Sequence, residues 1–205
     1  MVLPRSIRAD HRAIASRVTD GAKVLDVGCG DGALLALLKG TKSVDARGLE
    51  LSATEVGLAL TRGLSVVQGD ADIDLEIFPD DGFDVAILSK TIQQMRRPAH
   101  VLQELARIAP EVIISFRNYG LWSRRFDLLA KGRMPGHRAW HDEGALHPST
   151  AADMIDLTDS LGLKLIAAAP VNGTAIGEFR ETGLSRLNWG ADEVILHLGR
   201  KGKTS

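Results

Sequence analysis

The chain has 205 residues, a length that suits one α/β domain with a full core but not two ordinary domains joined by a linker. Hydrophobic residues form 44% and charged residues 25% of the sequence, and a formal net charge of -1 indicates neither a nucleic-acid binder nor a membrane-surface protein. No apolar run approaches the roughly 20 residues needed to span a bilayer. We therefore expect a cytoplasmic protein, and the single cysteine leaves no partner for an internal disulfide.

The first two thirds of the chain alternate between short apolar runs and segments of helical character. A helix is expected over residues 5–18, and a capping box formed by Ser52 and Glu55 opens another. Pro98 suits the first turn of a further helix, and Thr150 suits the N-cap of the last one. These patterns predict strands at 23–27, 44–50, 64–68, 83–89, 111–116, 163–169 and 193–198, with helices at 33–39, 54–62, 98–108 and 151–160.

This alternation predicts an α/β fold, a Rossmann-like doubly wound sheet with helices on both faces. Seven strands are expected, and most of them should be parallel. Residues 171–192 are rich in Gly, Asn and Thr and show no convincing helix, so the last two strands should form an antiparallel closing pair with a surface loop between them. Residues 119–148 lack clear periodicity, and we interpret them as a cap or insert within a single domain over residues 1–205.

The first expected strand runs directly into three glycines at alternate positions, Gly28, Gly30 and Gly32. Glycine lets the backbone approach a ligand closely and adopt positive φ values. A dinucleotide fold would show the spacing G-x-G-x-x-G, whereas this motif reads G-x-G-x-G and carries an acid, Asp26, inside the strand. The motif therefore suits a ligand without a phosphate whose methionine end carries an ammonium group, and Asp26 is placed to hold that group. Cys29 is interpreted as a small residue inside the loop.

Two further acids lie at the ends of the next two expected strands. Glu50 follows Gly32 by 18 residues, the distance expected for a carboxylate that accepts both hydroxyls of a ribose. Asp70 ends the third strand, where it could accept a hydrogen bond from an adenine amino group. Each acid alone is as well explained by a solvated loop or a helix cap. Three acids at successive strand ends match the edge at which open parallel sheets bind ligands.

Over residues 23–198 the sequence resembles the class I S-adenosylmethionine (SAM)-dependent methyltransferases, chiefly through the glycine motif and Glu50. The resemblance implies a seven-stranded sheet with an antiparallel last strand and SAM or S-adenosylhomocysteine as the cofactor. Methyl transfer in such proteins is an in-line displacement, to which the protein contributes orientation and sometimes a base. The cofactor site so implied contains Asp26, Gly28, Cys29, Gly30, Gly32, Glu50, Leu51, Asp70, Ala71 and Ser89.

A narrower resemblance covers residues 83–98 and 101–105, and a second block covers 114–122 and 131–135. Both are similar to the methionine-biosynthesis protein MetW. That family is associated with homoserine O-acyltransferases, so the resemblance implies such an enzyme as a partner. The family usually has an aromatic, Asn and His cluster after the Met-Pro element, whereas residues 139–147 here depart from that pattern.

Several polar residues are candidates for the acceptor side of the site. Ser89 and Gln93 follow the fourth expected strand, while Asn118 and His141 belong to the end of the fifth strand and the cap. Neighbouring Gln94 is better explained as a solvated amide. The cap histidines do not follow the H-E-x-x-H spacing and the only cysteine is remote in sequence, so we expect no metal site.

Residues 117–138 interleave arginines with aromatic residues. Such a segment can form a docking surface for a partner enzyme, clamp an anionic substrate, or form an amphipathic helix with its aromatic side chains in the core. The last interpretation is favoured for most of these residues.

Two functions remain in contention. The first is a SAM-binding, MetW-like protein that supports a homoserine O-acyltransferase, and it is favoured because no obvious base accompanies the nucleotide motif. The second is a SAM-dependent methyltransferase whose small-molecule acceptor lies under residues 119–148. No nucleic-acid or membrane partner is expected, and the sequence leaves the oligomeric state and the acceptor open.

Overall fold

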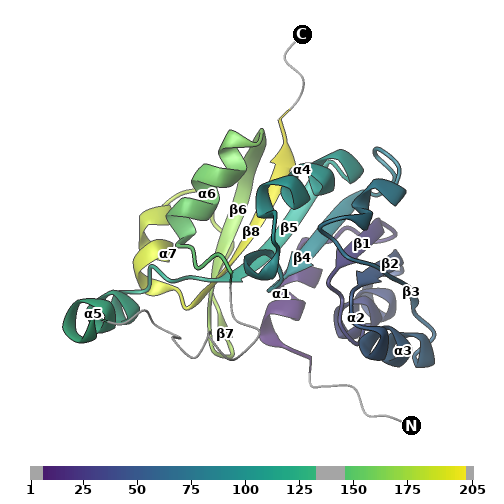
Figure 1. Ribbon diagram of the computed structural model, residues 1–205, viewed down its shortest axis with the longest axis horizontal. Helices are drawn as coiled ribbons and strands as arrows, with labels where there is room; N and C mark the ends of the chain where they lie inside the picture. The colour runs from purple at the N-terminus through teal and green to yellow at the C-terminus, as the bar shows by residue number, and fades with distance from the viewer. Residues whose placement is uncertain (1–6, 133–145, 202–205) are drawn as a thin grey trace.

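An eight-stranded sheet in the order β3-β2-β1-β4-β5-β8-β6-β7 runs through the computed structural model, which describes residues 7–132 and 146–201 (Figure 1). Neighbouring strands from β3 to β5 are parallel, and β8 lies antiparallel between β5 and β6. The predicted doubly wound, mostly parallel sheet with an antiparallel closing pair is therefore confirmed. The strands are β1 (Lys23–Val27), β2 (Asp45–Glu50), β3 (Ser65–Gln68), β4 (Val85–Ser89), β5 (Glu111–Arg117), β6 (Leu163–Asn172), β7 (Ala175–Ile176) and β8 (Glu193–Arg200).

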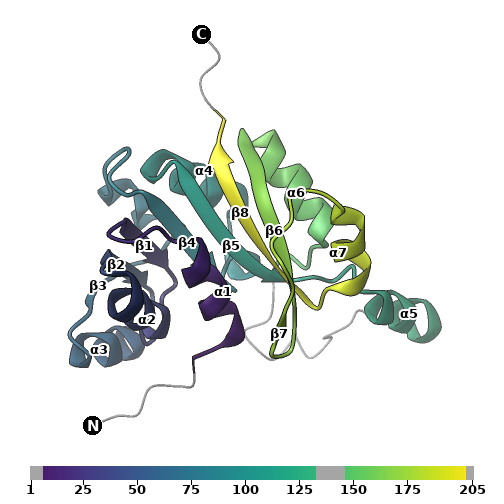
Figure 2. The ribbon, with the colours of Figure 1, turned by 180° about the vertical axis from the view of Figure 1, so that it is seen from behind.

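Helices cover both faces of the sheet, as the opposite views of Figures 1 and 2 show. One core cluster joins the sheet to α1, α2 and α3, and a second joins it to α4 and α6, with α7 packed against it. The helices are α1 (Ala9–Arg17), α2 (Ala33–Lys42), α3 (Ala53–Thr61), α4 (Pro98–Ile108), α5 (Trp122–Lys131), α6 (Ala151–Ser160) and α7 (Leu184–Gly190), with short 3-10 turns η1 (Asp74–Ile77) and η2 (Ile92–Gln94).

Local sequence explains most of these boundaries. All five residues of β4 are buried, as expected for a central parallel strand covered on both faces. Ser52 caps α3 by accepting a hydrogen bond from the Glu55 amide, and Thr150 forms a reciprocal capping box with Asp153 at the start of α6. Pro98 occupies the first turn of α4.

Three features of the fold differ from the prediction. Helix α2 continues through Gly40 to Lys42. A Cβ at Gly40 would lie more than 4 Å from atoms outside its own stretch of helix, and Leu38, two residues earlier, is buried in the core. The segment expected to be a bare loop contains α7, a seven-residue helix, and the two-residue strand β7. Strand β7 pairs with the end of β6 and makes the sheet eight-stranded.

The segment interpreted as a cap contains the expected helix, but the expected burial of its aromatic side chains was wrong. It contains helix α5, but no residue of this helix is buried. Trp122 and Phe126 are 62% and 63% exposed, so these aromatic side chains do not enter the core.

The strand order reverses between β1 and β4, which lie side by side in the sheet. Open α/β sheets bind ligands in the crevice beyond the carboxyl ends of the strands at such a reversal. The fold therefore places the glycine loop after β1 and the turn after β4 on the two sides of one crevice. Among the described residues, no helix is both long and apolar enough to cross a membrane.

Candidate functional site

Two adjoining hollows lie at the carboxyl ends of β1 to β4. The larger has a volume of about 630 Å³ and the smaller about 360 Å³, and Gly28 lines both. Glu50, Leu51, Asp70 and Ala71 line the larger hollow. The smaller hollow is lined by Asp26, Cys29, Gly30 and Ser89. Of the predicted cofactor residues, only Gly32 lines neither.

The glycine loop adopts a conformation that larger residues avoid. Gly28, Gly30 and Gly32 have φ values of +70°, +54° and +76°. A Cβ at Gly28 would lie 2.7 Å from the side chain of Thr91, so glycine here lets the loops after β1 and β4 come together. A Cβ at Gly30 would meet no protein atom within 4 Å and would project into open space. A Cβ at Gly32 would collide with Leu64, so this glycine serves the packing of α2 instead.

The Glu50 carboxylate is fixed at the tip of β2. Its Oε2 accepts a hydrogen bond of 2.8 Å from the Gly30 amide, and its Oε1 accepts one of 2.9 Å from the Ser52 amide. Each carboxylate oxygen keeps further acceptor capacity. The glycine loop and β2 thus hold an anionic acceptor in place against the larger hollow.

Asp70 lies across the larger hollow and is already paired. Its Oδ1 accepts the Asp72 amide at 2.9 Å, and its Oδ2 accepts Nη2 of Arg96 at 2.8 Å. The Arg96 side chain is 68% exposed. An ion pair with so exposed a partner contributes little stability, so a ligand donor can replace the guanidinium at modest cost.

Asp26 is the buried acid of the smaller hollow. Its side chain is 1% exposed, and its Oδ1 has no hydrogen-bond partner. Burial raises the pKa of Asp26 to about 7, with the nearby Glu50 acting in the same direction and Arg8 opposing it. Burying a carboxylate oxygen without a hydrogen-bond partner costs folding free energy, so Asp26 is placed to accept a hydrogen bond from a ligand.

Helix α1 covers the smaller hollow with two residues that sequence reasoning missed, its N-cap residue Arg8 and His11 in its first turn. Arg8 forms two 3.0 Å hydrogen bonds with Asp10, and its Nη2 donates to Ser89 Oγ at 2.8 Å. Burial, reinforced by the charge of Arg8, lowers the pKa of His11 to about 4, and its buried Nδ1 has no partner. Only the expected helix over residues 5–18 hinted at this cover, because no motif spacing singles out either side chain.

Cys29 has the modest role expected of it. The thiol is buried, and burial raises its pKa, so it stays protonated. A Cβ at neighbouring Gly48 would lie 2.5 Å from Cys29 Sγ, which shows that the thiol packs tightly between the loop and β2.

Gln93 and Asn118 lie outside both hollows, and their hydrogen bonds are structural. The buried Gln93 amide bonds the backbone of Arg117 on both sides, at 2.9 and 3.1 Å, and reaches Ser149 Oγ at 3.1 Å. Asn118 is fully buried, and its Nδ2 donates to three carbonyls at the end of α7, those of Leu187, Asn188 and Ala191. The solvated amide Gln94, in contrast, does line the larger hollow.

The remaining cap candidate, His141, lies outside the described residues, as do His137 and Asp142. His147 is described, and its backbone amide donates to the Gln93 carbonyl at 3.1 Å. Within residues 7–132 and 146–201, no group of three or more His, Cys, Asp or Glu side chains is arranged to hold a metal ion.

Solved structures with a similar fold include several SAM-dependent methyltransferases. One from Thermotoga maritima has a TM-score of 0.71 at 17% identity, with 94% of this chain and 88% of that chain covered. Another, from Mesorhizobium loti, has a TM-score of 0.67 at 17% identity and covers 94% of this chain and 98% of that one. At these identities the likeness shows the fold, which is that of class I methyltransferases.

Two curated proteins are related in sequence. The bifunctional methionine biosynthesis protein MetXA/MetW of Rhodopirellula baltica is 30% identical over 171 residues, or 77% of this chain. The fatty-acid O-methyltransferase of Mycolicibacterium smegmatis is 34% identical over 108 residues, or 50% of this chain. The matched regions span 27% and 39% of those longer proteins. The model of the family described as methionine biosynthesis protein MetW matches residues 8–197, and the chain therefore belongs to the MetW family.

Proposed function

We propose that this protein binds SAM or S-adenosylhomocysteine in the paired hollows and supports a homoserine O-acyltransferase in methionine biosynthesis. The observation that carries the proposal is a pair of adjoining hollows at the glycine loop, with the fixed Glu50 carboxylate in one and the unpartnered Asp26 Oδ1 in the other. Class I methyltransferase neighbours and the MetXA/MetW relative support it.

The larger hollow fits the adenosine half of SAM. Glu50, held by two backbone amides, presents acceptors for a pair of ribose hydroxyls. Asp70 offers an acceptor for the adenine amino group once Arg96 moves aside. The apolar side chains of Leu51 and Met95 line the same hollow and provide surface for a purine ring.

The smaller hollow fits the methionine half. The unpartnered Asp26 Oδ1 provides the missing acceptor for an ammonium group, and ionisation of Asp26 is favoured once a cation lies beside it. Arg8 supplies a positive charge for the carboxylate at the other side of the hollow. Bound in this way, SAM would place its sulfonium near Gly28, where the two hollows join.

A supporting role agrees with the side chains around that junction. Of the described residues that line the larger hollow, Glu50, Asp70 and Asp72 carry carboxylates, and each already accepts hydrogen bonds from the backbone. Ser89 Oγ bonds Arg8 and Ser115. Each of these groups is already hydrogen-bonded and is therefore placed to hold a ligand rather than to deprotonate an acceptor.

The test is the rate of homoserine acylation by the acyltransferase of the same organism, with and without this protein and with SAM varied. We expect stimulation that depends on SAM concentration, together with co-purification of the two proteins. An unchanged rate with no association would refute the supporting role.

A methyltransferase activity is the second candidate, favoured by the relative that is a fatty-acid O-methyltransferase and by the extension of the larger hollow past Gln94 to Leu146. SAM supplies a methyl group on a sulfonium, and the acceptor would displace S-adenosylhomocysteine in line. Incubation with methyl-labelled SAM and a metabolite extract would give labelled product if this activity exists. Persistent absence of labelled product would remove it.

A further inference from the structure

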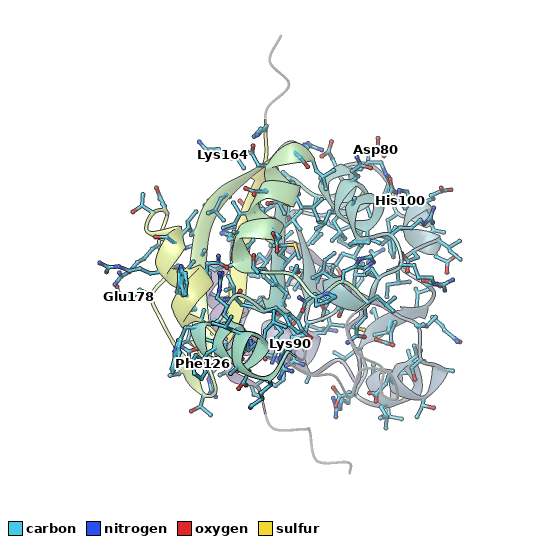
Figure 3. The ribbon with its side chains drawn as sticks, turned by 60° about the vertical axis from the view of Figure 1, so that its left-hand side comes forward. Asp80, Lys90, His100, Phe126, Lys164 and Glu178 are labelled. Carbon is cyan, nitrogen blue, oxygen red and sulfur yellow. The ribbon has the colours of Figure 1, made fainter. Side chains whose placement is uncertain are left out.

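Helix α5 is amphipathic, but its apolar side faces away from the protein core. Trp122, Phe126 and Leu129 follow the spacing i, i+4, i+7, so they lie along one side of the helix. These side chains are 62%, 63% and 85% exposed. Figures 1 and 2 both show α5 extending away from the sheet beside α7, and Figure 3 turns this side forward with Phe126 labelled. The apolar face of α5 is therefore directed outward.

The polar side of α5 fastens it to the rest of the protein. The Arg124 guanidinium pairs with the Asp192 carboxylate and donates to the Asn118 carbonyl at 2.5 Å, and its side chain is only 15% exposed. Arg125 Nε donates to the Gly120 carbonyl at 2.5 Å, and its guanidinium lies 4.3 Å from the centre of the Trp189 ring. These contacts hold the first turn of α5 in a defined orientation.

Two neighbouring groups widen the apolar face into a surface suited to protein binding. Trp189 on α7 is 53% exposed and lies against the guanidinium of Arg125, which follows Trp122 by three residues on α5. Within the described residues, no carboxylate forms an ion pair with Arg125, so its charge is available to a partner. Tryptophan and arginine are the residue types that most often dominate binding energy at interfaces.

We propose that the outer face of α5, formed by Trp122, Phe126 and Leu129 and flanked by Arg125 and Trp189, docks into an apolar groove of the homoserine O-acyltransferase. This inference rests on the proposed function and assigns the surface that contacts the partner. The acyltransferase is the favoured partner because, in one relative, a MetW portion shares one polypeptide with a MetXA portion. An acidic group at the rim of the groove would complement Arg125.

The mode of binding is that of a helix in a groove. Anchors at i, i+4 and i+7 are the pattern by which amphipathic helices insert into apolar grooves. The ten residues of α5 extend about 15 Å, which sets the length of groove required. No residue of this face lines either hollow, so the proposed docking does not use the side chains of the proposed SAM site.

The test compares Phe126→Glu and Leu129→Glu with Leu60→Glu, a control of the same chemistry at an exposed position on α3, at the other end of the sheet. The affinity of each variant for the purified acyltransferase is measured by biolayer interferometry, together with the stimulation of the acyltransferase. The melting temperature and sedimentation velocity of each variant are measured alongside. We expect each α5 variant to weaken binding by about tenfold or more and the control to bind like the wild type.

The outcomes separate this inference from the proposed function. Stimulation by the wild type that persists equally in both α5 variants would overturn the docking surface alone, as would equal weakening by Leu60→Glu. A wild-type protein that neither binds nor stimulates would overturn both. Lower melting temperatures in the α5 variants would show that the protein's own chain covers the face. A change from dimer to monomer would assign the face to a second copy of the chain. Either result would contradict docking on the acyltransferase.

Discussion

At the scale of single residues, the glycine loop and the three acids explain most of the candidate site. Asp26, Glu50 and Asp70 could be predicted because each lies where a strand ends, and parallel strands bring such ends to one edge. Arg8 and His11 could not be predicted in the same way. They reach the site through the packing of α1 over the glycine loop, which no local pattern encodes.

Asp26 illustrates a conflict between stability and binding. Its carboxyl is buried without a partner, and its pKa of about 7 lies above the ordinary value of 3.8. Between about pH 4 and pH 7 the folded protein keeps a proton on Asp26 that the unfolded chain has released. The free energy of unfolding therefore falls as the pH rises through that window.

Replacement of Asp26 by Asn should consequently stabilise the ligand-free protein at pH 8. The gain should be up to about 4 kcal/mol, set by the pKa difference, and should shrink as the pH falls toward 5. Thermal unfolding at the two pH values measures it. Asp45→Asn is the control, since that exposed carboxylate at the start of β2 should show no comparable pH-dependent gain. A variant less stable than the wild type at pH 8 would contradict this description of Asp26.

At the scale of secondary-structure elements, sequence and structure agree where an element has a clear apolar pattern and its apolar side chains are buried. Strands β1 and β4 and helices α4 and α6 follow from apolar runs and capping residues. An amphipathic helix was expected at α5, but not its exposed aromatic side chains, and α7 was not expected at all; neither helix has a buried residue. Their positions depend on polar contacts made by Arg124 and Asn118 to distant parts of the chain.

Asn118 is the principal of these contacts. Its Oδ1 accepts the amides of Gly120 and Ala151, while its Nδ2 donates to three carbonyls at the end of α7. The side chain thereby joins β5 to the starts of α5 and α6 and to the end of α7, which makes it a positioning residue for the region predicted to be a cap.

Asn118→Ala should destabilise the protein by about 2–4 kcal/mol, because buried donors and acceptors lose their partners. Chemical denaturation measures the change. Asn172→Ala serves as the comparison, since that exposed amide also bonds two backbone groups, those of Gly190 and Asp192, yet water can replace it. Equal losses in the two variants would show that Asn118 has no special part in holding these helices.

At the scale of the whole molecule, the sheet order brings groups far apart in sequence to one crevice. The reversal between β1 and β4 sets the glycine loop against Thr91, and α1 covers the smaller hollow. The helix α5 extends from the opposite end of the sheet from α3. The proposed cofactor site and the proposed docking face thus belong to different parts of the protein.

The most direct test of the central claim is titration calorimetry of S-adenosylhomocysteine into the wild type and the Glu50→Ala variant. Binding at one site per chain is expected for the wild type, with affinity reduced by about tenfold or more in the variant because the ribose hydroxyls lose a charged acceptor. Equal affinities in the two proteins would show that the ribose lies elsewhere, and no binding to the wild type would contradict the assignment of the paired hollows to SAM.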